Sequence, residues 1–171
     1  MSDLATSDFN LIMLVFRVLF GLTFFSHGYA KQFQGGKIAG TAGWFDSMGM
    51  KPGKVHAQLA AGTEMGAGLL MALGLVTPLA AAAVVGVMVV AGYTVHRGNF
   101  AVVKNGWEYT FVTALLAVAI AGLGPGEWSI DEALGLTDDV NGLVGAAIAL
   151  VVGVAAGIGQ IAAFYRPPAE G

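Results

Sequence analysis

Six ionisable side chains stand inside or at the borders of long apolar segments of this 171-residue chain. They are Arg17, His27, Lys31, Glu64, His96 and Glu108. Carboxylates and imidazoles can transfer protons, and cationic side chains donate hydrogen bonds to oxygen atoms. Because burying an unpaired charge is costly, each of these groups needs either a partner or a function.

The composition places the apolar segments in a membrane. Hydrophobic residues make up 56% of the chain and charged residues 11%, whereas soluble domains contain about 45–50% and about 25%. The chain has no cysteine, which excludes disulfides and thiolate chemistry, so redox chemistry would need a bound cofactor or a partner. The formal net charge of -3 excludes nucleic-acid binding based on bulk charge.

Five apolar segments are long enough to cross a bilayer as helices, which takes roughly 20 residues each. They cover residues 9–30, 57–76, 79–95, 107–123 and 140–164. Their richness in Ala, Leu and Gly, without alternation, favours helices over strands. The sequence therefore predicts an all-α integral membrane protein. We expect a four-helix membrane unit within residues 1–136, followed within residues 137–171 by a fifth transmembrane helix and a cytoplasmic tail.

Basic residues outside the five segments all fall on one side of the membrane. They are Lys31, Lys37, Lys51, Lys54, Arg97, Lys104 and Arg166. The positive-inside rule then predicts a plasma-membrane protein with its N-terminus outside and its C-terminus in the cytoplasm. The loop at 35–53 is open to two interpretations, a short interfacial helix or an ordered loop. Its apolar residues are Ile38, Trp44, Phe45, Met48 and Met50.

Glycines in three of the segments predict close helix packing, because small residues let helix backbones approach each other. In the first segment Gly21 and Gly28 share a helical face with Arg17. In the second, Gly62 and Gly66 flank Glu64. In the last, Gly153 and Gly157 form a further pair. This last pair suits either docking against another membrane protein or packing onto the chain's own bundle.

The ionisable cluster has a structural and a functional interpretation. Glu64 would take Arg17 as its counter-ion, with His27 as the other candidate, and such a pair could simply fix helix packing. The alternative is a ligand site in the cytoplasmic half of the membrane, where the cluster would hold a quinone head group and supply protons. Haem ligation by two histidines, or a metal site from His and Glu, are weaker alternatives. We assign no catalytic residue and no metal ligand.

Several short motifs follow one another between about residues 11 and 132. They are RVLFG at 17–21, FFSHGYAK at 24–31, AGWF at 42–45, EMGAG at 64–68, LGLVTP at 73–78, NGWEY at 105–109 and GPGEWSID at 124–131. In order and spacing this set resembles the DoxX family of small membrane proteins. The resemblance implies a four-helix membrane unit, to which the fifth helix is an addition. It also implies relatives such as the small subunit of a thiosulfate:quinone oxidoreductase and membrane anchors of redox enzymes.

Three functions follow as hypotheses. The first is an accessory subunit of a larger membrane oxidoreductase or respiratory-chain assembly, in contact with lipid and other membrane subunits and not catalytic on its own. The second is a quinone-reactive subunit of a thiosulfate:quinone-type oxidoreductase. The third is a small-solute carrier, although the sequence lacks an inverted repeat or visibly broken helices.

Overall fold

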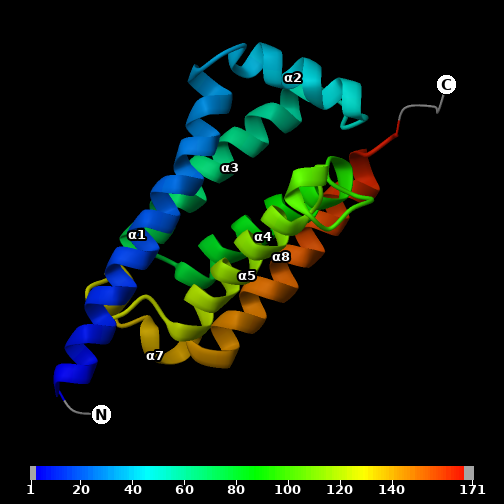
Figure 1. The fold of residues 1–171 in the computed structure, drawn as a ribbon. Coiled ribbons are helices and arrows are strands. Elements are labelled where there is room, and N and C mark those ends of the chain that lie inside the picture. Colours follow the sequence, from blue (N-terminus) through cyan, green and yellow to red (C-terminus); the bar gives the residue numbers. More distant parts are fainter. Residues whose placement is uncertain (1–2, 168–171) are drawn as a thin grey trace.

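The structure of the protein, a computed structural model, describes residues 3–167 and is helical throughout its main elements (Figure 1). The helices are α1 (Asp3–Phe33), α2 (Lys37–Met48), α3 (Gly53–Leu73), α4 (Thr77–Thr94), α5 (Glu108–Leu123), α6 (Ile130–Ala133), α7 (Thr137–Val140) and α8 (Gly142–Phe164), with a 3-10 turn, η1, at Val102–Lys104. The predicted all-α class is confirmed. All five predicted membrane segments are helices in the structure.

In the part of the chain that the structure describes, three helices are long and apolar enough to cross a membrane by themselves. They are Thr6–Phe33 within α1, all of α4, and α8. Helix α5 is apolar but shorter, and α3 carries the polar residues Lys54, His56, Gln58 and Glu64, which lower its hydropathy. The chain is therefore a membrane helical bundle, and crossing by α3 and α5 stays a prediction.

The helices form two groups. Helix α1 packs along α3, and α2 packs against α3. Helix α4 packs between α5 and α8, and the short turn between Leu73 and Thr77 joins the two groups. In Figure 1 the α1–α3 pair leans away from α5 toward the end of the bundle that carries α2.

The loop at 35–53 contains a helix, α2, so the first of its two interpretations, a helix, is correct. Its residue Phe45 is buried and packs with Met50 and Ala57 in a small core. Trp44, by contrast, is 47% exposed. Helix α2 therefore packs against α3 through the side that carries Phe45, and its opposite side is exposed.

The predicted second span runs too far at its C-terminal end. Helix α3 ends at Leu73 because Gly74 takes a left-handed φ of 62°, and its N–H bonds back to the last turn. Val76 is also left-handed, with a φ of 44°, which is unusual for a β-branched residue. The turn therefore needs support from outside the helix pair.

That support is a buried polar network at one end of the bundle, which we call the acidic end. The Asp131 carboxylate accepts hydrogen bonds from Val76 N at 2.6 Å and from Thr77 N at 2.9 Å, and the Thr77 hydroxyl donates to it at 2.7 Å. Nearby, the Arg17 guanidinium donates to the carbonyl oxygens of Ala72 and Trp128. The network ties α1, the α3–α4 turn and the segment after α5 together.

The opposite end, which we call the basic end, carries α2, the loop between α4 and α5, and the end of α8. Here Met50 pairs with Tyr165 in an isolated antiparallel bridge. Arg166 N donates to Gly49 O at 2.8 Å. The loops with the basic residues named above thus share one end of the bundle, as the five-segment arrangement predicts.

Glycines set the distance between α1 and α3. A Cβ atom added at Gly21 would lie 2.4 Å from the carbonyl oxygen of Gly68, and one added at Gly28 would lie 2.5 Å from that of Ala61. The expected packing role of Gly62 and Gly66 is wrong, because an added Cβ would meet nothing within 4 Å at either position. These two glycines lie on the exposed side of α3.

The glycines of α8 pack onto the chain's own bundle. A Cβ atom at Gly153 would lie 2.6 Å from the carbonyl oxygen of Ala82, and one at Gly157 would lie 2.7 Å from the Val89 side chain. Of the two interpretations of this pair, the structure selects packing against α4. Gly153 and Gly157 are therefore occupied inside the protein.

Replacing Gly21 by alanine should destabilise the protein, whereas Gly62→Ala should be neutral or stabilising. The added methyl at Gly21 overpacks a backbone contact, which typically costs about 1–3 kcal/mol. At Gly62 the methyl only improves helix propensity. Thermal unfolding in detergent measures the difference. Equal melting temperatures for the two variants would contradict the assigned α1–α3 interface.

Asp131→Asn should also lower stability, because the α3–α4 turn loses hydrogen bonds to a charged acceptor, each worth about 1.5–3 kcal/mol. The exposed Glu127 offers a control of the same chemistry, and Glu127→Gln should leave the melting temperature unchanged. If both variants melt like the wild type, the carboxylate does not hold the turn.

Candidate functional site: an intramembrane cavity

A cavity of about 660 Å³ lies between the two helix groups. Its walls come from α1, α2, α3, α4, α5 and α8, and most of its lining is apolar. The side chains with polar groups that line it are Lys31, His27, Trp44, Thr63, Glu64, Thr94, His96, Tyr109, Thr110 and Gln160. Large, mainly apolar cavities with a few converging polar groups are typical of small-molecule sites.

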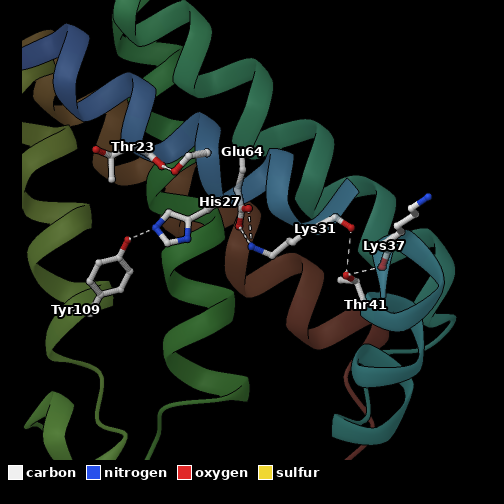
Figure 2. Close-up of polar contacts among 8 residues, drawn as sticks. Thr23, His27, Lys31, Lys37, Thr41, Glu64 and Tyr109 are labelled. Atoms are coloured by element: carbon white, nitrogen blue, oxygen red, sulfur yellow. Dashed lines mark hydrogen bonds and ion pairs between the residues drawn. The ribbon is translucent and has the colours of Figure 1, made fainter. Parts of the chain in front are cut away.

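The strongest polar feature of the cavity is an ion pair between α1 and α3. Lys31 Nζ donates to Glu64 Oε1 at 2.8 Å and to Oε2 at 2.6 Å. The Glu64 side chain is 5% exposed and that of Lys31 25%. Figure 2 shows the two groups meeting between their helices. An ammonium group has three donors, so one N–H of Lys31 remains for a ligand.

The second polar feature joins α1 to α5. The Tyr109 hydroxyl and His27 Nε2 lie 3.0 Å apart, one turn along α1 from Lys31 (Figure 2). Both side chains line the cavity. Whichever group donates in this bond, a hydroxyl and an imidazole at the wall can exchange a hydrogen bond or a proton with a bound molecule.

His96 reaches the cavity from the end of α4. Its Nδ1 lies 3.2 Å from the carbonyl oxygen of Asn105 in the following loop. On the other side, the Gln160 amide lies 3.1 Å from Nδ1 of His56, whose ring packs edge-on against Phe164. His56 is buried and is not a lining residue, so this contact links α3 to α8 behind the cavity wall.

The structure brings together four of the six predicted cluster residues, and leaves two outside. His27, Lys31, Glu64 and His96 line the cavity, whereas Arg17 and Glu108 do not. The expected Arg17–Glu64 pair is wrong, because Glu64 pairs with Lys31 instead, and the other candidate partner, His27, lies within hydrogen-bond distance of Tyr109. Arg17 lies in the acidic-end network, near the opposite end of α3. The Glu108 carboxylate instead accepts a hydrogen bond from Val102 N at 2.9 Å and holds η1.

Metal ligation finds no support in the described part of the chain. Among the side chains that the structure describes, which leave out those of Asp3, Asp138 and Asp139, no group of three or more His, Asp or Glu could hold a metal ion. The polar wall of the cavity therefore offers hydrogen bonds and protons.

Tyr109, Thr110 and Gln160 are lining residues that the sequence reasoning missed. Tyr109 stands beside Trp107 and Glu108 in one of the family-like motifs, and that motif was the available signal. Thr110 and Gln160 carry no charge and sit within apolar helices, so their residue types alone give no signal.

Comparison with known proteins agrees with the resemblance seen in the sequence. The DoxX family model matches residues 12–97, which is half of the chain and includes most of α1 and all of α2, α3 and α4. No curated protein and no solved structure matches the chain. The match covers His27, Lys31, Glu64 and His96 of the cavity, and it ends before α5 and α8. This chain belongs to the DoxX family of membrane proteins.

Proposed function

We propose that this DoxX-family protein binds a quinone in the intramembrane cavity and serves as a subunit of a larger membrane oxidoreductase. The observation that carries the proposal is the composition of the cavity. Its polar groups include the Lys31–Glu64 ion pair and the Tyr109–His27 hydrogen bond, while most of the remaining wall is apolar.

A quinone head group matches this wall. Its two carbonyl oxygens accept hydrogen bonds, and the free N–H of Lys31 and the Tyr109–His27 pair can donate them. Its ring suits the aromatic and aliphatic side chains nearby, such as Phe24 and Phe45. The volume of about 660 Å³ lies within the range of about 300–1,000 Å³ that is usual for ligands of this size.

Quinone reduction takes up two electrons and two protons and yields a quinol. Glu64, His27 and His96 are cavity side chains that can hold and pass protons. They lie toward the basic end, so we propose that protons enter from the aqueous phase at that end. The electrons would come from a redox centre in a partner subunit, since the chain contains no cysteine with which to bind an iron–sulfur cluster through thiolates.

This proposal retains the accessory-subunit hypothesis and gives it a chemical role. The sequence also suggested that the glycines of α8 could dock another membrane protein. That argument is weakened, because Gly153 and Gly157 pack on α4. The basic end would face the cytoplasm of a plasma membrane, following the positive-inside rule.

Tyr109→Phe should weaken binding of a short-chain benzoquinone to the purified protein by about fivefold, because one neutral hydrogen bond is worth about 1 kcal/mol. Glu64→Gln should have a larger effect, since it breaks the ion pair that fixes Lys31. Equilibrium dialysis or fluorescence quenching measures the dissociation constants, with melting temperatures as a check on folding.

Glu108→Gln serves as the matched control, because Glu108 lies at the basic end but outside the cavity. Its amide oxygen can still accept the bond from Val102 N, so quinone affinity should stay that of the wild type. Absence of saturable quinone binding by the wild-type protein would overturn the proposed function. So would unchanged affinity in folded Tyr109→Phe and Glu64→Gln variants.

The proposed orientation can be tested with single cysteines, because the natural chain has none. Glu127→Cys at the acidic end should react with a membrane-impermeant maleimide in intact cells. Lys104→Cys at the basic end should react only after the cells are permeabilised. The reverse pattern would place the basic end outside.

A further inference from the structure

We infer that the ligand carries a long apolar tail, of the isoprenoid or alkyl class, which lies in a groove between α3 and α8. This inference rests on the proposed quinone function and adds the class of ligand. The groove, called the tail groove below, comprises apolar lining residues that α3, α4 and α8 contribute to the cavity: Leu59, Ala60, Leu79, Ala83, Val152 and Ala156.

The cavity is longer than a head group requires. Its lining residues on α4 and just beyond run from Leu79, in the first turn, to His96. At a rise of 1.5 Å per residue this stretch covers about 25 Å of helix. His27, Lys31, Glu64 and Tyr109 pair at the end near His96, and the lining toward Leu79 is apolar. A molecule with a polar head and an apolar tail fits this polarity.

The tail groove also opens sideways toward the bilayer. Leu59 of α3, Leu79 of α4 and Val152 of α8 line it and are 50%, 55% and 47% exposed. The other side of the cavity, between α1 and α5, is crossed by the Tyr109–His27 hydrogen bond. A tail seated with its head at Lys31 therefore has an apolar path to lipid between α3 and α8.

Small side chains line this path. Ala60, Ala83 and Ala156 come from three different helices and line the same groove. A tail gains little by moving from lipid into an apolar groove, because both surroundings are apolar. The groove therefore acts by shape: it leaves room for a tail that a larger side chain would exclude.

The test compares a tail-less benzoquinone with a long-chain isoprenoid quinone of the same head group, each bound to the full chain in nanodiscs. Ala156→Phe should weaken binding of the long-chain quinone at least tenfold and leave binding of the tail-less quinone unchanged. Ala83→Phe, on α4, should act in the same way. Ala155→Phe is the matched control, because Ala155 is exposed on α8 but does not line the cavity.

The outcomes separate the two proposals. Equal binding of both quinones by wild type and Ala156→Phe would overturn the tail groove and leave the quinone site standing. Failure of the wild type to bind either quinone would overturn the proposed function itself. A third measurement follows co-purified phospholipid: its loss in Ala156→Phe, with quinone binding unchanged, would assign the groove to a phospholipid acyl chain and overturn the inference.

Discussion

The burial of Arg17 and Asp131 at the acidic end is the constraint on which the rest of the fold depends. Arg17 is 2% exposed and Asp131 1%, and unpaired groups at such positions would cost several kcal/mol. The hydrogen bonds of both side chains go mainly to backbone atoms of segments far away in the sequence. Arg17 donates to the carbonyl oxygen of Ala72, which precedes α4, and to that of Trp128, which follows α5. Asp131 accepts hydrogen bonds from the backbone N–H groups at the start of α4. These bonds fix α1, α3 and α4 at one end.

With the acidic end fixed and α1 held against α3 by Gly21 and Gly28, the two helix groups have freedom to separate only toward the basic end. There the contacts between groups are local: the Tyr109–His27 bond on one side, and the His56–Gln160 contact with the Met50–Tyr165 bridge on the other. The cavity lies between these links. Its ion pair sits on the α1–α3 side, so a bound molecule meets charge on one wall and mostly apolar helices on the other.

The sequence was sufficient for the helical class, the five long helices and the four cavity residues that stand out as ionisable within apolar segments. It could not supply the partner of Glu64, because that depends on the register of α1 against α3, which the contacts of Gly21 with Gly68 and of Gly28 with Ala61 set. Spacing likewise marked Gly62 and Gly66 as a packing pair without saying which face of α3 is covered. From the sequence, Asp131 looks like a surface carboxylate. Only the structure shows that it is buried against the α3–α4 turn.

The central claim is that the polar end of the cavity, rather than the lipid-facing surface, receives a quinone head group. Photoaffinity labelling with an azidoquinone in membranes that contain the full chain, followed by peptide mapping, tests this claim most directly. The account predicts labels on cavity-lining residues near Lys31, Glu64 and Tyr109, removed by excess unlabelled quinone. Labels confined to exposed faces such as Leu143 to Val151 of α8, and unaffected by that competition, would contradict it.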